Sequence, residues 1–117
     1  MNDKPIPFSQ NWNNKLDCEY FTTVRYWARQ YKTGEVRQVT LKDQLIKDCQ
    51  VMAISLVKMH QIGALLSFTD AGLAPEDLRA MLRKMYKKKE VPPDEAEFAV
   101  VLLRTVKDYR VGKGGAG

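Results

Sequence analysis

The fold is decided by the stretch FTTVRYW at residues 21–27, which is rich in β-branched and aromatic residues and predicts a β-strand. Before it, residues 5–9 form a short extended candidate, because a residue that precedes proline is pushed toward β geometry. After it, Thr33 and Gly34 mark a turn, and residues 35–41 alternate between apolar and polar side chains as a strand does. No helix separates these early segments, so a parallel βαβ sheet is excluded.

The pattern continues through a plausible hairpin at residues 42–44 into a long apolar run at residues 45–57. From Val51 onward apolar residues occupy both faces of this run, so we expect one bent and largely buried strand. A short helix is then predicted from the spacing of Met59, Ile62, Leu65 and Leu66. Residues 69–72, with Gly72 last, are expected to end it.

The best helix of the chain begins at Pro75, a residue that suits the first helical position. Glu76 and Asp77 complement the positive end of its dipole. One apolar stripe follows, made of Leu78, Met81, Leu82, Met85 and Tyr86. Residues 97–103 then predict a strand that is apolar on both faces and therefore central in the sheet. This order predicts an α+β domain, a small bent β-barrel or sheet of about five to six strands with two or three flanking helices.

Length and composition bound the function. The chain has 117 residues and a net charge of +5, which fits one domain; we place it at residues 1–109 and expect a disordered, glycine-rich tail at 110–117. No apolar run approaches the ~20 residues that span a bilayer, and the start lacks a signal-like apolar stretch, so we expect a cytoplasmic protein with no membrane partner. Cys18, Cys49 and His60 are too few ligands for a structural zinc, so we expect free, at least half-buried thiols, no metal and no cofactor.

The order and spacing of these segments resemble the ASCH domain, a family with the PUA-like fold of a small β-barrel and flanking helices. The resemblance covers roughly residues 5–107 and rests on residues 20–25, 32–36, 78–86 and 98–103 with the long strand between them. It implies binding of RNA or a nucleotide-like ligand in a cleft lined by Gly, Lys, Glu and Arg. Aligned on Arg25, the other three positions carry Cys18, Tyr20 and Thr23.

One bacterial branch of that family is an amidohydrolase that deacetylates the exocyclic amine of acetylated cytidine with a Lys, a Thr and a Glu. Here Thr23 matches the threonine, Asp70 lies next to the glutamate position, and Tyr20 occupies the lysine position. The resemblance thus implies Thr23 and Asp70 as catalytic residues if this alternative holds. A protein-interaction module with a vestigial cleft is a second alternative, and enzymatic activity stays open.

Arg25 is the main candidate for ligand binding, because a guanidinium offers a rigid fork of donors to phosphates and base edges. Tyr20 and Trp27 are candidates for stacking on a base, with Thr23 beside them. The plainer alternatives are a structural ion pair of Arg25 with Asp17 or Glu35, and packing of the aromatic rings in the core.

The densest run of positive charge lies near the end of the second helix and includes Lys87, Lys88 and Lys89. These lysines are candidates for contacting a nucleic-acid backbone. The alternative is a solvated helix face whose cations complement the helix dipole. The partner expected from the sequence is therefore RNA or a nucleotide-like small molecule.

Overall fold

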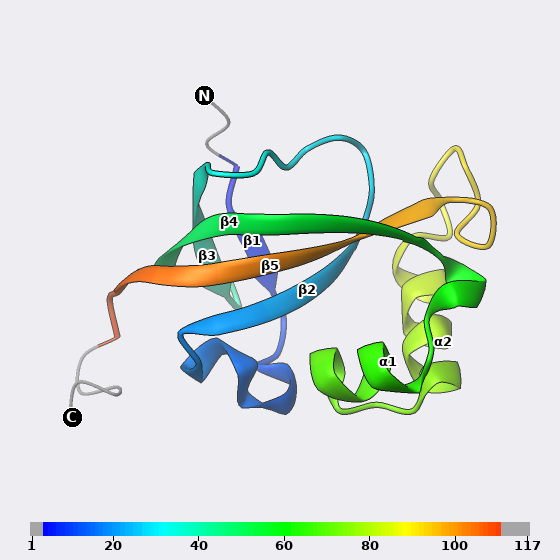
Figure 1. The fold of residues 1–117 in the computed structure, drawn as a ribbon, viewed down its shortest axis with the longest axis horizontal. Helices are drawn as coiled ribbons and strands as arrows, with labels where there is room; N and C mark the ends of the chain where they lie inside the picture. The colour runs from blue at the N-terminus through cyan, green and yellow to red at the C-terminus, as the bar shows by residue number, and fades with distance from the viewer. Residues whose placement is uncertain (1–3, 111–117) are drawn as a thin grey trace.

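A strongly curled sheet of five strands forms the centre of the molecule (Figure 1). The computed structural model describes residues 4–110. The strands lie in the order β1-β3-β4-β5-β2. Along the chain the elements are β1 (Ile6–Phe8), the 3-10 helix η1 (Trp12–Asp17), β2 (Tyr20–Tyr26), β3 (Val36–Leu41), β4 (Gln44–Lys58), the 3-10 turn η2 (Met59–Gln61), α1 (Ala64–Ala71), α2 (Pro75–Met85) and β5 (Glu97–Asp108).

The sheet is mixed, because β1 pairs with β3 in parallel and every other pair is antiparallel. The register shifts once between β3 and β4 and twice between β4 and β5. Such irregularities increase twist and bend a strand, which lets the long strands β4 and β5 curl the sheet into a half-barrel. The α+β fold with a small bent sheet and flanking helices is therefore confirmed, as is the central position of β5.

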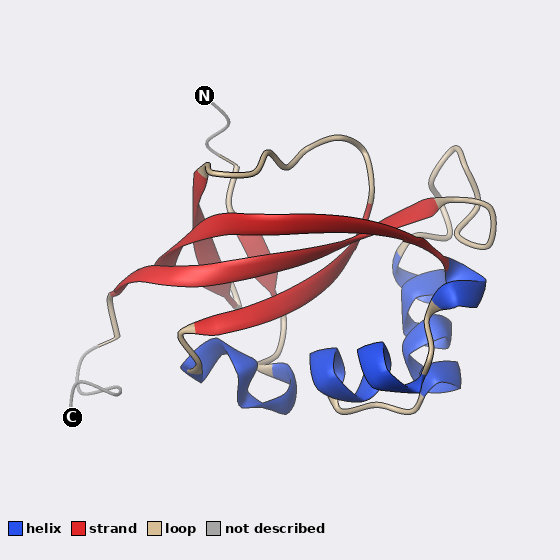
Figure 2. Cartoon of the chain, in the orientation of Figure 1, coloured by secondary structure: helices blue, strands red, loops and turns tan. Residues whose placement is uncertain are grey.

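Two apolar clusters fill the two sides of the curl. One lies inside it and includes Phe8, Phe21 and Val101. The other lies under the helices and includes Leu82 and Phe98. Figure 2 shows η1, α1 and α2 gathered on one side of the long strands, so the helices cover only part of the sheet.

Local turn chemistry agrees with the sequence in two places. Gly34 has a φ of 94°, a conformation that favours glycine, at the turn before β3. Lys42 and Asp43 have φ values of 51° and 68°, as the two central residues of a tight β3–β4 hairpin require. The hairpin predicted at residues 42–44 is confirmed.

The expectation of a largely buried β4 is wrong for its second half. Met52 and Leu56 are exposed, although Val51 is fully buried. The pairing with β3 ends at Gln50, and beyond that region β5 is the only strand among residues 4–110 that pairs with β4. Without a second neighbour, the apolar residues there keep one side open to solvent.

The short helix also differs from its prediction. Gly63 is extended and separates the turn η2 from α1, so one helix does not run from Met59. Thr69 and Asp70 lie inside α1 rather than ending it, and Gly72, with a φ of 71°, ends the helix in a left-handed cap. Side chains of η1 and β2 bind Asp70, and such tertiary contacts outweigh weak helix signals in the sequence.

Three further expectations concern the ends and the thiols. Both cysteines are free, with Cys49 buried, but Cys18 is exposed rather than half-buried. Arg110 binds Asp17 and the carbonyl of Leu16. The rest of the expected tail, residues 111–117, lies outside the described residues. Within residues 4–110, no helix has the length and apolar character to cross a membrane.

Candidate functional site

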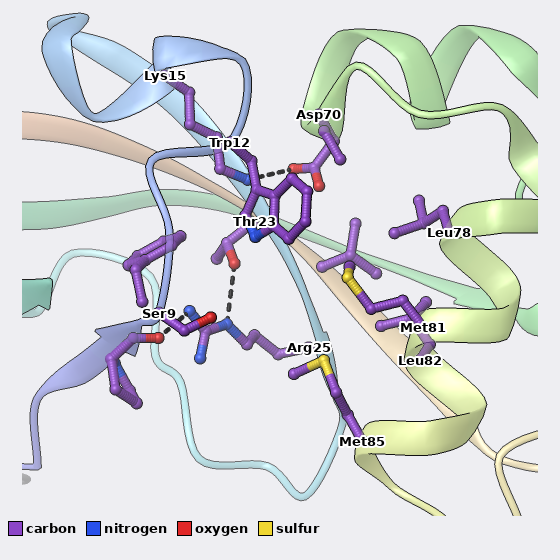
Figure 3. A pocket seen from close by; sticks show the side chains of 14 residues that line it. Ser9, Trp12, Lys15, Thr23, Arg25, Asp70, Leu78, Met81, Leu82 and Met85 are labelled. Atoms are coloured by element: carbon purple, nitrogen blue, oxygen red, sulfur yellow. Dashed lines mark hydrogen bonds and ion pairs between the residues drawn. The ribbon is translucent and has the colours of Figure 1, made fainter. Parts of the chain in front are cut away.

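A cavity of about 80 Å³ lies where β2, one of the two edge strands of the sheet, meets η1 and the helices (Figure 3). Its polar side chains come from three separate elements and one loop: Ser9, Lys15, Thr23, Arg25 and Asp70. Its apolar walls are formed by Phe8, Trp12, Leu78, Met81, Leu82 and Met85, among others. The curl of the sheet brings its two edge strands, β1 and β2, near each other. We call the gap between these strands the seam, and the cavity lies in it.

Lys15 and Asp70 form a buried ion pair in this cavity. Lys15 Nζ lies 3.1 Å from Asp70 Oδ1, and the two residues are 7% and 3% exposed. Burial lowers the pKa of Lys15, more than the carboxylate of Asp70 raises it, and the charge of Arg25 adds to the lowering. Buried titratable groups with shifted pKa values cluster at functional sites, and Lys15 is one such group in a cavity.

Asp70 occupies the last turn of α1, where the helix dipole disfavours a negative charge. Two hydrogen bonds to the carboxylate offset this cost. Thr22 Oγ1 donates to Asp70 Oδ1 at 2.7 Å, and Lys15 Nζ donates to the same oxygen. Because both bonds end on Oδ1, Asp70 Oδ2 is the carboxylate oxygen that is more available to accept a further hydrogen bond.

Arg25 spans the seam between β2 and β1. Its Nε donates to Thr23 Oγ1 at 2.9 Å, its Nη2 donates to the carbonyl of Pro7 at 2.5 Å, and its guanidinium lies 4.6 Å from the centre of the Phe8 ring. Within the described residues, no carboxylate lies at ion-pair distance from Arg25; Glu35 binds Arg37 instead. The alternative of a structural ion pair with Asp17 or Glu35 is therefore not what holds Arg25, and the guanidinium lines the cavity without a carboxylate at ion-pair distance.

The structure brings three of the predicted site residues together and leaves others apart. Thr23, Arg25 and Asp70 line one cavity. Tyr20 lies at the far end of β2, opposite Arg104, and is 51% exposed outside the cavity lining. Trp27 follows β2 and packs beside the inner apolar cluster, at a separate shallow hollow.

The lysines predicted to contact a nucleic-acid backbone lie in the turn that follows α2. Lys87, Lys88 and Lys89 are all exposed. Lys89 Nζ lies 5.4 Å from the centre of the Tyr26 ring, at the C-terminal end of β2. They are not among the residues that line the cavity.

Lys15 lines the cavity, but it is not among the site residues predicted from the sequence. It lies eight positions before Thr23, a spacing that suggests no contact between the two. The chain turns sharply directly before Lys15, because Asn13 and Asn14 adopt left-handed conformations with φ values of 58° and 55°. Asparagine is enriched in that region, so the Asn-Asn pair was the available signal of a tight reversal.

Among the described residues, no group of three or more His, Cys, Asp or Glu side chains is placed to hold a metal ion. The polar side chains of the cavity supply two cations, one carboxylate, two hydroxyls and the indole N–H of Trp12. Such a set binds a polar organic molecule through hydrogen bonds, and its apolar walls suit a flat ring.

Comparison with solved structures shows a likeness of fold. No family model and no curated protein matches the sequence. The chain resembles the crystal structure of protein EF3133 from Enterococcus faecalis V583, assigned to the family model DUF984, with a TM-score of 0.68 over 97% of this chain and 82% of that one. At 8% identity the likeness concerns the fold alone, and it is compatible with a PUA-like fold.

Proposed function

We propose that the cavity binds a nucleotide-like ligand, free or as part of an RNA, in the manner of an ASCH-type domain. The observation that carries this proposal is the convergence of Lys15, Thr23, Arg25 and Asp70 on one cavity with aromatic and methionine walls. Three of these four are almost fully buried. Burying charged groups is costly, so a cavity that concentrates them is better explained by a ligand than by stability.

The chemistry of the walls supports a base-like ring. Phe8 and Trp12 offer aromatic surfaces, while Met81 and Met85 line the side formed by α2. Aromatic rings and the polarizable methionine sulfur both make favourable contacts with a flat heterocycle. Arg25, at the seam, offers its guanidinium to a phosphate or to a base edge.

The test is a titration of ¹⁵N-labelled protein with the four common ribonucleosides, their 5′-monophosphates and short single-stranded RNAs. We expect shifts of the Thr23, Arg25 and Asp70 amides, and a 10- to 100-fold weaker affinity in Arg25→Ala, about 1–3 kcal/mol. Arg104→Ala is the matched control, because this exposed arginine pairs with Glu19 outside the cavity. Shifts confined to exposed lysines, or equal losses in both variants, would overturn the proposal.

A second candidate function is amide hydrolysis on acetylated cytidine, and the position of Lys15 favours it. Tyr20 stands where the amidohydrolase branch has lysine and lies outside the cavity, whereas Lys15 enters the cavity from η1. Lys15, Thr23 and Asp70 then form a set of lysine, threonine and acid. In this reading Lys15 acts as the neutral amine: it takes the proton of the Thr23 hydroxyl as that oxygen adds to the acetyl carbonyl, and it gives the proton to the cytidine amine as the C–N bond breaks. Water then hydrolyses the acetyl ester of Thr23, which releases acetate and restores the hydroxyl.

This candidate has its own test, separate from binding. Purified protein is incubated with N4-acetylcytidine, and release of cytidine is followed by chromatography. Turnover that is lost in Thr23→Val and in Lys15→Met, but kept in the control Tyr20→Phe, supports hydrolysis. Binding of N4-acetylcytidine without turnover removes hydrolysis and leaves the binding proposal standing.

A further inference from the structure

The cavity lies at the free edge of β2, and this position exposes the main chain as well as side chains. Thr23, Val24 and Arg25 all line the cavity. Successive side chains of a strand point to opposite faces, so Thr23 and Arg25 share one face and Val24 lies on the other. A cavity that touches both faces of one strand lies at the edge of that strand. The other edge of β2 is occupied by β5, so the cavity sits on the unpaired side.

The register of the β2–β5 pair decides which main-chain groups face that side. Thr105 N donates to the carbonyl of Glu19, and Trp27 N donates to the carbonyl of Glu97. In an antiparallel pair the residues whose N–H and C=O bind the partner strand alternate with residues whose groups point away. The odd-numbered residues of β2 therefore face β5. The N–H and C=O of Val24 point away from β5, toward the cavity.

Other parts of the chain lie against the same free edge on either side of Val24. The side chain of Gln30 donates from Nε2 to the carbonyl of Tyr26 at 2.8 Å. At the other end, the hydroxyl of Thr22 is bound to Asp70, so α1 lies against that part of the strand. An added peptide strand needs a row of several free main-chain groups. Within the cavity this edge offers the main-chain groups of one residue, Val24, which suits a small planar ligand instead.

We propose that the N–H and C=O of Val24 are the specificity-determining groups of the site. They bind one edge of a single-ring heterocycle that carries an adjacent hydrogen-bond donor and acceptor, as a pyrimidine base does. The inference rests on the proposed function, because it specifies how the nucleotide-like ligand is recognised. The N–H of Val24 donates to a ring carbonyl or ring nitrogen, and its C=O accepts from the neighbouring N–H of the ligand.

The size of the cavity favours one ring over two. A cavity of about 150 Å³ is the size that encloses a benzene molecule. The volume here is about 80 Å³, which is less than a cavity that encloses a whole ring. Only one edge of the ring therefore enters, and the attached sugar stays outside. Arg25, which binds Pro7 across the seam, lies where the sugar or phosphate of a bound nucleotide leaves the cavity.

The experiment compares ligands that differ by one hydrogen bond. The full chain is titrated with uridine, cytidine, guanosine and 3-methyluridine, whose ring lacks the N3–H donor. We expect uridine and cytidine to bind, and guanosine and 3-methyluridine to bind at least about tenfold more weakly, the effect of one lost hydrogen bond with an unpaired partner. The readout is the shift of the Val24 amide signal together with the dissociation constant.

A backbone substitution then tests the protein side. Total chemical synthesis replaces the Val24 amide by an ester, which removes the N–H donor and keeps every side chain. The same change at Thr22 is the matched control, because that N–H also faces the free edge but Thr22 does not line the cavity. We expect about tenfold weaker binding of uridine for the Val24 ester and unchanged binding for the Thr22 ester. Thermal unfolding of both proteins verifies that each folds.

The outcomes distinguish a failure of the proposed function from a failure of the role assigned to Val24. If no nucleoside binds the unmodified protein, the proposed function fails and the inference fails with it. If nucleosides bind but 3-methyluridine equals uridine, or the two esters behave alike, the proposed function stands and the role of Val24 is wrong. If a peptide displaces uridine and the Val24 ester weakens the peptide alone, the free edge is a strand-binding site and the inference is overturned.

Discussion

Replacing Asp70 by Asn tests the buried ion pair that organises the cavity. The change keeps the size of the side chain and leaves an oxygen that accepts from Thr22, but it removes the negative charge 3.1 Å from Lys15 Nζ. Lys15 is then a buried cation without its carboxylate. Breaking a buried pair in this way costs about 3–5 kcal/mol. We therefore expect Asp70→Asn to lose about 3–5 kcal/mol of unfolding free energy at pH 7.

The loss depends on pH, with a sign that follows from the pKa of Lys15. That pKa is already lowered from its ordinary value of 10.5 by burial, and removal of Asp70 takes away the main influence that raises it. Between the lowered pKa and 10.5, the unfolded chain binds more protons than the folded one, so stability rises with pH. Once pH exceeds 10.5 Lys15 is neutral in both states. The difference between wild type and Asp70→Asn therefore shrinks as pH rises toward 10.5.

The assay is urea unfolding of wild type, Asp70→Asn, Lys15→Met and the double variant at pH 7 and pH 9.5. We expect each single variant to be strongly destabilised and the double variant to recover part of the loss, because it leaves no unpaired buried charge. A change below about 1 kcal/mol for Asp70→Asn at pH 7 would refute the reasoning. So would a loss that grows with pH.

Three other predictions concern the core, the thiols and the basic turn. Leu82 is 1% exposed under α2, so Leu82→Ala should cost about 2–5 kcal/mol in urea unfolding, and a loss below about 1 kcal/mol would contradict that packing. Burial raises the pKa of the Cys49 thiol to about 11, whereas Cys18 is exposed. Iodoacetamide at pH 8 should therefore modify Cys18 quickly and Cys49 only on unfolding, as peptide mass mapping would show. Finally, changing residues 87–89 from Lys to Gln should weaken RNA binding and flatten its salt dependence; an unchanged salt slope would exclude this turn from the interface.

The helices show where local signals suffice and where they do not. α2 was predictable because Pro75, the acidic first turn and the stripe through Leu82 all agree with one helix. α1 was misplaced because its second half contains weak helix signals around Asp70. Its position depends on contacts with Lys15 and Thr22, which lie about 50 residues away in the chain, and no local pattern reports them.

The second half of β4 gives the converse case. Its apolar residues, among them Met52 and Leu56, look like those of a buried strand. Burial depends on how many neighbours a strand has. The pairing of β3 with β4 stops at Gln50, so β3 does not lie beside this part of β4. An apolar composition predicts a strand, but the length of the neighbouring strand decides what is buried.

By itself, the amino-acid sequence determined the strand-rich α+β fold and the hairpin at residues 42–44, and it made Arg25 a candidate for ligand binding. These depend on local periodicity, turn conformations and residue type, which short stretches of sequence encode. The choice of Thr23 and Asp70 as candidates rested instead on the resemblance to the ASCH domain. Only the tertiary structure decided that Lys15 joins them, that Tyr20 lies elsewhere and that Val24 turns its main chain to the cavity. The physical reason is that the curl of the sheet and the reversal at η1 set which distant segments meet, and those contacts are non-local.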